Sequence, residues 1–176
     1  YDDRQHRENA TLGKPTNFIW FPNEDASRHK SVQRYIELGE SQGLHTRFKC
    51  RIRKPWYSVP SVYTTEIGML KRSHNTPRLI LNRANAFTTD TAYRIRSMTV
   101  SADKLVCCFV NPLTSLSAEL EGRHYGGGVL ELVPSEIEKL SIPLPDEFEP
   151  DIDALDCAIR SRATTDVLAE NGRKVL

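Results

Sequence analysis

The sequence lacks any apolar run long enough to cross a membrane. A spanning helix needs about 18 or more consecutive apolar residues, and none of these 176 residues lies in such a stretch. The start of the chain also lacks the basic and apolar regions of a signal peptide. We therefore expect no membrane partner and a cytoplasmic location.

Cysteine is scarce, and its spacing does not suit a metal site. The four cysteines are Cys50, Cys107, Cys108 and Cys157, and none of their spacings matches the Cys-x-x-Cys or Cys/His sets that bind zinc. We expect the first three to be small buried hydrophobic side chains, because each lies in an apolar or alternating segment. Reduced thiols also suit the cytoplasm.

Motifs for phosphate binding and catalysis are missing as well. Gly126-Gly127-Gly128 precedes a strand pattern, lacks the Lys-Ser/Thr of a P-loop and is not Gly-x-Gly-x-x-Gly. None of the five histidines has an obvious nucleophile or carboxylate partner in the sequence. A self-contained nuclease or hydrolase remains the rival from the enzyme class, but it needs a carboxylate or histidine cluster that the basic part of the chain is too poor in acids to supply.

Charge is present in abundance but is unevenly distributed. Residues 28–96 hold fourteen lysines and arginines against four acidic residues, whereas residues 119–176 hold thirteen acidic residues against six basic ones. The whole chain nevertheless carries a formal charge of only +1. If folding does not interleave the two parts, one face of the molecule will attract a polyanion.

The segment from Thr46 to Ile52 shows the clearest pattern. Phe48, Cys50 and Ile52 alternate with basic residues, and alternation with a period of two predicts a strand with one apolar and one basic face. Trp56 and Tyr57 follow closely. Flat side chains beside basic ones can stack on bases, although aromatic residues equally often pack in a core.

Other predicted elements flank this segment. In the N-terminal part we expect a buried strand over 17–21 and a long helix that starts at Asn23 or Asp25 and ends at Gly43. Further strands are expected over 78–82, 93–100 and 129–133. Ser135 and Glu138 have capping-box spacing for a short helix, residues 146–153 read as an acidic linker, and residues 152–168 can form a final helix.

Between these strands lies an apolar helical region. Asp103 or Ser101 can start a helix through Val110, and Asn111-Pro112 either interrupts it or caps a second helix running to Glu121. Its apolar residues are expected to form core: Leu105, Val106, Phe109, Leu113, Leu116 and Leu120. The predicted fold class is α+β, with a mixed sheet, the long N-terminal helix and a buried helix near residues 102–121.

Three segments resemble the C-terminal region of bacterial DNA adenine methyltransferases of the N6 class, including the Eco57I-type and XhoI/PaeR7I-like modification enzymes. The first is 109–140, with the core phrase Gly-Arg-x-Tyr-Gly-Gly-Gly-Val-Leu at 122–130. The second is 47–59, which contains Arg-Ile-Arg-Lys-Pro-Trp-Tyr, and the third is 78–82 together with Thr89-Asp90-Thr91. The similarity covers about residues 14 to 145.

This resemblance implies a target-recognition domain that binds double-stranded DNA for a catalytic domain of the same polypeptide. The domain would comprise residues 1–145, followed by an acidic linker and C-terminal helix over 146–176. The family's catalytic Asn/Asp-Pro-Pro-aromatic tetrad and its glycine-rich S-adenosylmethionine loop are absent here, and Asn111-Pro112-Leu113 is not the tetrad. We expect no cofactor in this chain, S-adenosylmethionine in an upstream catalytic domain, and therefore a piece of a longer protein that begins before Tyr1.

The candidate DNA contacts combine basic and aromatic residues. A protein-interaction module of a restriction-modification complex, docking an acidic partner on the same basic face, is the alternative function. The candidates are Arg47, Lys49, Arg51, Arg53, Lys54, Trp56, Tyr57, Lys71, Arg72, Arg83, Arg94, Arg96, Arg123 and Tyr125.

Overall fold

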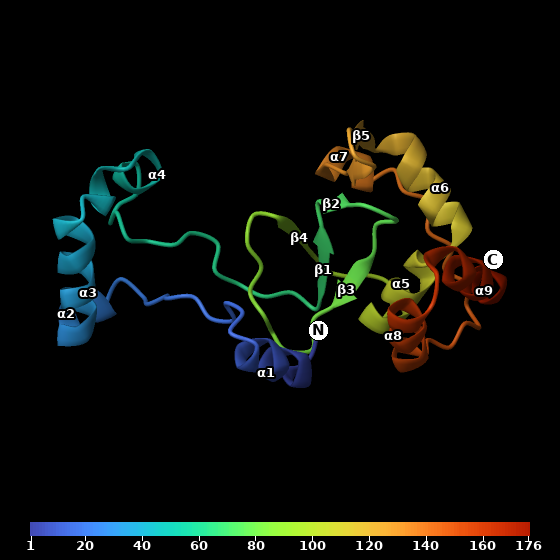
Figure 1. The fold of residues 1–176 in the computed structure, drawn as a ribbon, viewed down its shortest axis with the longest axis horizontal. Helices are drawn as coiled ribbons and strands as arrows, with labels where there is room; N and C mark the ends of the chain where they lie inside the picture. Colours follow the sequence, from blue (N-terminus) through green and yellow to red (C-terminus); the bar gives the residue numbers. More distant parts are fainter. The chain divides into compact units, whose positions relative to one another are not determined.

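The computed structural model describes all residues from 1 to 176 and confirms the α+β class (Figure 1). The chain divides into two compact units. We call Tyr1–His6 together with Thr64–Leu176 the sheet unit, and Arg7–Tyr63 the helical unit. The first helix, α1 (Asp3–Thr11), begins in one and ends in the other. None of the helices is both long and apolar enough to span a bilayer.

The sheet unit contains two three-stranded sheets, both antiparallel, so the predicted mixed sheet is wrong. One has the order β3-β1-β4, with β1 at Ile67–Leu70, β3 at Leu79–Leu81 and β4 at Ala92–Ile95. The other has the order β2-β6-β5, with β2 at Arg72–Ser73, β5 at Arg123–Tyr125 and β6 at Val129–Glu131. The expected strands at 78–82, 93–100 and 129–133 are therefore present in shortened form.

Lys71 joins the two sheets through its backbone. Its N–H donates to the Thr91 carbonyl at 3.1 Å, and its own carbonyl accepts from the Leu132 N–H at 3.1 Å. Residues 67–73 thus pair with β4 at one end and with β6 at the other.

Two capped helices follow the sheets. α5 (Ala102–Phe109) starts where the Ser101 hydroxyl accepts from the Lys104 N–H. α6 (Pro112–Glu121) starts where the Asn111 side-chain oxygen accepts from the Thr114 N–H at 2.9 Å. Proline suits the first helical turn because it has no N–H to leave unpaired, so Asn111-Pro112 begins a second helix.

The core of the sheet unit lies between the sheets, α5 and one side of α6. Its buried side chains are Ile67, Met69, Leu79, Val106, Phe109, Ala118, Leu130 and Leu132. Three of the predicted core leucines are not part of it: Leu113, Leu116 and Leu120 are 42%, 57% and 76% exposed. A helix was predicted correctly over these residues, but its leucines are exposed and its buried residues are Thr114 and Ala118.

The C-terminal region of the sheet unit forms three helices: α7 (Pro134–Ile137), α8 (Ile152–Ser161) and α9 (Thr164–Val175). The single helix predicted over 152–168 is wrong, because the chain is extended at Arg162 and Ala163. The Asn171 amide donates to the carbonyls of Cys107 and Val110 at 2.8 and 2.7 Å, which fastens α9 to the end of α5. By packing, residues 146–176 belong with the sheet unit, while the functional boundary at 145 stays a prediction.

The helical unit has no strand, so the strands predicted at 17–21 and 46–52 are wrong. It contains α2 (Asp25–Arg28), α3 (Lys30–Ser41), the 3₁₀ turn η1 (Leu44–Thr46) and α4 (Phe48–Arg51). The long N-terminal helix is broken at His29, whose backbone is extended. Gly43, at φ +70°, ends the helical path as expected. A strand needs a partner for its backbone groups, and in residues 44–51 helical turns provide local partners instead.

Burial is sparse in the helical unit. Gly39 is its one buried residue, and it lies against the Trp56 ring, since a Cβ at this position would be 2.5 Å from Cη2. Phe48 and Ile52, predicted to lie on the apolar face of a strand, are 64% and 63% exposed. The unit is therefore held by a small aromatic cluster and by its local helical bonds.

Candidate nucleic-acid interface

Five basic residues of the helical unit lie within eight positions, and we call residues 47–54 the basic segment. α4 carries Lys49 and Arg51, while Arg47 precedes that helix and Arg53 and Lys54 follow it, so the side chains do not form the single row that a strand would give. Four of the five are exposed and Arg53 is half-buried. The residues are Arg47, Lys49, Arg51, Arg53 and Lys54.

No cation of the basic segment pairs with a carboxylate. Arg53 donates to the Ser58 carbonyl at 3.2 Å, and the Arg51 guanidinium lies 5.5 Å from the centre of the Phe48 ring. Neither contact neutralises a charge. The segment thus presents positive charge that the chain does not itself satisfy.

Trp56 and Tyr57 have internal partners. Trp56 Nε1 donates to Glu40 Oε1 at 3.0 Å, and its ring centre lies 5.8 Å from that of Tyr57. Tyr57 in turn contacts Phe21, with ring centres 5.5 Å apart. These contacts favour packing as their role, because stacking on bases would require the rings to leave the cluster.

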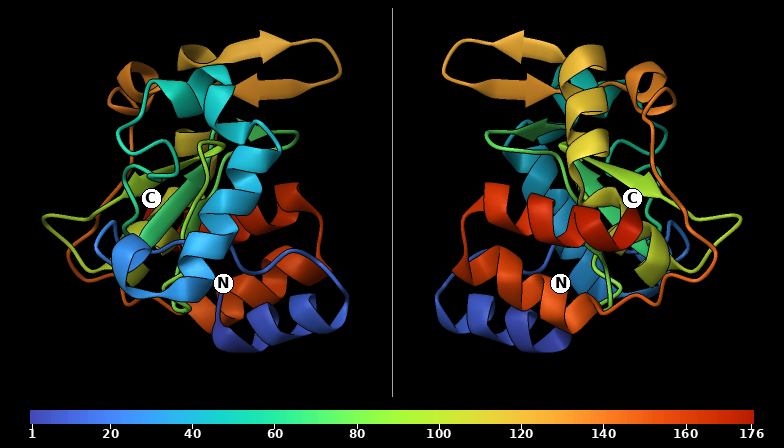
Figure 2. Two further views of the ribbon diagram at one scale, coloured as in Figure 1. Left: turned by 90° about the vertical axis from the view of Figure 1, so that its left-hand side faces the viewer. Right: turned by 90° about the vertical axis from the view of Figure 1, so that its right-hand side faces the viewer.

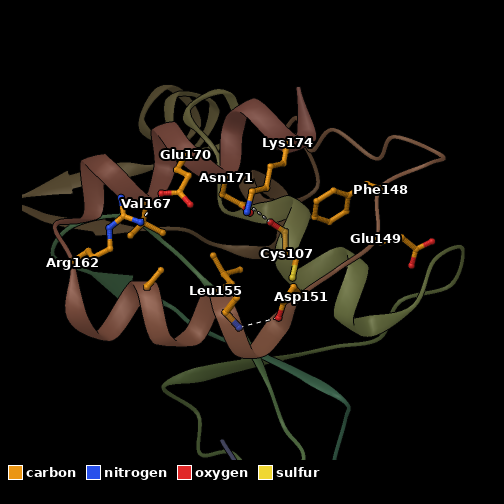
Figure 3. A pocket seen from close by; sticks show the side chains of 12 residues that line it. Cys107, Phe148, Glu149, Asp151, Leu155, Arg162, Val167, Glu170, Asn171 and Lys174 are labelled. Atoms are coloured by element: carbon orange, nitrogen blue, oxygen red, sulfur yellow. Dashed lines mark hydrogen bonds and ion pairs between the residues drawn. The ribbon is translucent and has the colours of Figure 1, made fainter.

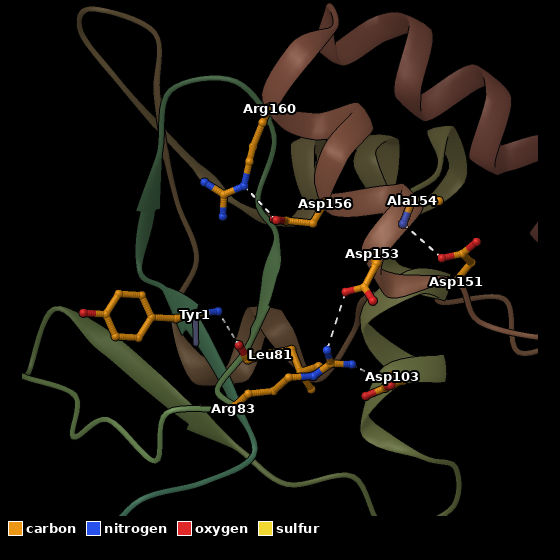
Figure 4. A network of polar contacts seen from close by, with 9 residues as sticks. All are labelled: Tyr1, Leu81, Arg83, Asp103, Asp151, Asp153, Ala154, Asp156 and Arg160. Atoms are coloured by element: carbon orange, nitrogen blue, oxygen red, sulfur yellow. Dashed lines mark hydrogen bonds and ion pairs between the residues drawn. The ribbon is translucent and has the colours of Figure 1, made fainter. Parts of the chain in front are cut away.

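Several candidate cations of the sheet unit have partners inside the protein. Figure 4 shows Arg83 between α5 and α8, 3.3 Å from Asp103 and 3.5 Å from Asp153. Lys71 places its ammonium 5.1 Å from the centre of the Tyr93 ring. Arg94 is half-buried on β4, and Arg96 is exposed just beyond that strand. This group is dispersed over the unit.

The hairpin formed by β5 and β6 gathers the remaining candidates. Arg72, Glu131 and Arg123 are neighbours in register across the three strands. Arg72 lies 3.4 Å from Glu131 and places its guanidinium 5.8 Å from the centre of the Tyr125 ring. Arg123 Nε donates to Glu136 Oε1 at 2.7 Å.

Both carboxylates of this group are held in their charged form. A hydrogen bond from Tyr125, aided by Arg72, lowers the pKa of Glu131. The Val133 N–H, which donates to Glu136 at 2.8 Å, and then Arg123 lower the pKa of Glu136. Neither acid was among the residues predicted from the sequence. A signal was present: Glu136 stands three residues after Val133 at the start of α7, where a carboxylate caps a helix, although the predicted cap paired Ser135 with Glu138.

A pocket of about 90 Å³ lies between α5, α8 and α9 (Figure 3). Its lining mixes acids with Arg162 and Lys174 and includes the Cys107 thiol. Burial raises the pKa of Cys107 to about 11, so the thiol is protonated and unreactive near neutral pH. No three His, Cys, Asp or Glu side chains lie close enough to hold a metal ion.

Comparison with known proteins gives two consistent results. The model of the family described as "Type II methyltransferase M.Eco57I, C-terminal domain" matches residues 1–176. Type II methyltransferase M.AccI of Acinetobacter calcoaceticus is 26% identical over 133 residues, which cover 73% of this chain and 25% of that protein. The chain thus spans about a quarter of its curated relative, and no solved structure matches it significantly. The resemblance seen in the sequence is confirmed, and the chain belongs to the M.Eco57I C-terminal domain family of Type II methyltransferases.

Proposed function

We propose that this chain recognises double-stranded DNA for a site-specific, adenine-specific DNA methyltransferase of a restriction-modification system. One observation carries the proposal: the basic segment holds five cations, no acid and no internal carboxylate partner. An exposed cation cluster of this kind suits DNA, whose phosphates supply most of the affinity of such complexes.

The distribution of charge supports the same reading. The helical unit contains ten lysines and arginines and five acidic residues, a formal charge of +5. The remaining residues of the chain therefore carry –4. A positively charged unit attached to a negatively charged one orients the chain toward a polyanion, because the local field and not the total charge guides association.

In this proposal a separate catalytic domain, and not this chain, carries out the methyl transfer. The tetrad and the glycine-rich loop that bind adenine and S-adenosylmethionine in the family are not among these residues, and the pocket between α5, α8 and α9 resembles neither. The cofactor and the flipped adenine would be held by a catalytic domain of the same polypeptide. This chain would hold the duplex in position for that domain.

The test is binding of a labelled duplex to the 176-residue chain, followed by fluorescence anisotropy over a range of salt concentrations. We expect a dissociation constant in the range of about 1–100 μM near physiological salt, and a log–log slope of about –0.9 per phosphate bound. Replacing Arg47, Lys49 and Arg51 together by Gln should flatten the slope by about one unit for each phosphate that the variant no longer binds. Lys14→Gln, an exposed lysine of the same unit outside the basic segment, is the matched control and should bind as the parent does.

Three results would contradict the proposal. The first is no binding at all, and the second is binding that does not depend on salt. The third is a folded triple variant that binds DNA as well as the parent chain does. In that third case an acidic protein partner becomes the better candidate, because the exposed Phe48 and Ile52 beside the cations would suit a protein surface.

A further inference from the structure

We propose that the β5–β6 hairpin is the element that reads base edges, with Arg123 as its principal contact and Arg72 as a second one. This inference rests on the proposed function, since it presupposes that the chain binds duplex DNA. It assigns to the hairpin a task different from that of the basic segment, and four features of the hairpin support it.

The first feature is the way the hairpin presents its two faces. Leu130 faces the core at 4% exposure. Its neighbour Glu131 lies on the opposite face, in the row that also contains Arg72 and Arg123. The two carboxylates lie low, with side chains of Glu131 and Glu136 15% and 13% exposed, while the Arg72 and Arg123 side chains are 67% and 57% exposed. Each guanidinium therefore pairs with a mostly buried carboxylate and is itself largely exposed to solvent.

The second feature is the geometry of Arg123. Its Nε donates to Glu136 Oε1, and Glu136 Oε2 accepts from the Val133 N–H. The start of α7 thus fixes the position of the carboxylate, and the carboxylate fixes the plane of the guanidinium. The two terminal nitrogens donate no hydrogen bond within the chain, and a fork of this kind matches the O6 and N7 acceptors of guanine.

The third feature is charge balance. The four ionised side chains of this group, two arginines and two glutamates, sum to zero. A face with no net charge gains little from phosphates, and the Glu131 carboxylate would repel them. Base edges are different, because they present donors as well as acceptors: arginine suits guanine, and a carboxylate can accept from cytosine N4. The hairpin is therefore suited to distinguish base sequences, and the basic segment is suited to bind phosphates and hold the duplex in position.

The fourth feature is the form of the hairpin. Figure 2 shows its two strands running side by side from the region of α6 to an open turn. At the base, Gly122 is tightly enclosed, and a Cβ there would lie 2.6 Å from Leu130 Cδ1 and 2.8 Å from the Ala118 carbonyl oxygen. At the tip, Gly126, Gly127 and Gly128 have nothing within 4 Å of a Cβ position. A two-stranded ribbon fits the major groove of B-DNA, and this one combines a fixed base with a slender tip.

The experiment separates base reading from phosphate binding. The parent chain and its variants are each allowed to select from duplexes with a randomised central region, and the bound fraction is sequenced. The salt slope of each variant is measured alongside on one fixed duplex. Thermal unfolding confirms that every variant used is folded.

Arg123→Lys keeps the charge but loses the fork. We expect the preference at one base pair to fall by about 5- to 150-fold, the range that one bidentate contact gives, with the salt slope unchanged. Glu136→Gln keeps an oxygen for the Val133 N–H but releases Arg123, and it should weaken the same preference. Lys139→Gln, which removes an exposed cation paired with Glu121 at 3.3 Å outside the hairpin, should leave both readouts as they are.

Each alternative outcome has a definite meaning. If Arg123→Lys selects the same sequences as strongly as the parent does, or if the parent shows salt-dependent binding without any base preference, the hairpin is not the reading element and the proposed DNA binding still stands. If Arg123→Gln flattens the salt slope equally for all sequences, Arg123 is a phosphate contact and the inference is wrong. If the parent binds no duplex, the proposed function itself is wrong.

Discussion

The two units treat their cations in opposite ways. In the sheet unit Arg72, Arg83 and Arg123 each pair with a carboxylate, whereas no lysine or arginine of the helical unit does so. Exposed ion pairs contribute little to stability, but they fix the direction in which a side chain points. Unpaired cations keep their freedom and their full attraction for an anion. One unit is thus built for defined geometry and the other for charge.

The largest contrast concerns burial, and paired substitutions can break it. Ile67 is fully buried in the sheet unit, while Ile52 in the helical unit is 63% exposed. We expect Ile67→Asp to destabilise the sheet unit by about 3–5 kcal/mol, because an unpaired charge would enter the core. Ile52→Asp should change stability by less than about 0.5 kcal/mol. Urea unfolding followed by circular dichroism measures both, and equal losses would show that Ile52 is covered in solution.

A second prediction sharpens the contrast between buried and exposed caps. Asn111 is fully buried, and its amide donates to the Cys108 carbonyl at 2.6 Å and to Thr114 Oγ1 at 2.8 Å, while its oxygen caps α6. Asn111→Ala should cost about 1–3 kcal/mol because it leaves buried backbone groups unsatisfied. Ser101→Ala removes an exposed cap and should cost about 1 kcal/mol or less. Similar costs for the two variants, measured by urea unfolding, would contradict this ranking.

The third prediction tests whether the small cluster of the helical unit is its main support. Gly39→Ala would push a methyl group into the Trp56 ring and should destabilise that unit by about 1–3 kcal/mol. It should also shift the tryptophan emission. Gly126→Ala at the open hairpin tip is the control and should stay within about 0.5 kcal/mol of the parent. An unchanged emission spectrum for Gly39→Ala would mean that Trp56 does not pack there.

The smallest effect near neutral pH is chemical. Cys157 is exposed and Cys50 half-buried, whereas Cys107 and Cys108 are buried, so a thiol reagent should label Cys157 first and the buried pair only after unfolding.

Burial raises the pKa of Cys107 to about 11, above its ordinary value of 9.0. The folded state therefore favours the protonated thiol. Its contribution to stability is complete below pH 9 and is lost as the pH rises through about 11. A Cys107→Ser variant should show less of this alkaline loss in pH-dependent unfolding.

Local signals in the sequence predicted local structure well. The end of α3 before Gly43 was predicted, and the start of α5 at Ser101 and the separate start of α6 at Asn111 were each one of two alternatives that the sequence left open, because a cap acts within three or four residues. The strands at 79–81 and 129–131 were found from short apolar runs. The cations of the candidate site were also visible, as residue types.

Contacts between residues far apart in the chain could not be predicted from the sequence. The alternation at 46–52 favoured a strand, yet Phe48 and Ile52 are also one helical turn apart, and an exposed segment has no buried face to decide between the two periods. The leucines of α6 were assigned to the core because they are apolar, and residue type does not show whether another element covers a side chain. The pairing of Arg123 with Glu136, thirteen residues away, depends on how β5 and α7 meet, which no local pattern specifies.

The segment 67–73, in which β1 and β2 belong to different sheets, also bears on the order of folding. On one side, residues 67–70 pair with β3 and β4, which follow closely in the chain; on the other side, residues 72–73 pair with residues 130–131. Closing a longer loop costs more entropy and slows folding. The β3-β1-β4 sheet should therefore form first and the hairpin dock last. By the same reasoning the hairpin can detach from β2 while the other sheet stays paired, so its amide protons should exchange with solvent before those of β1 do.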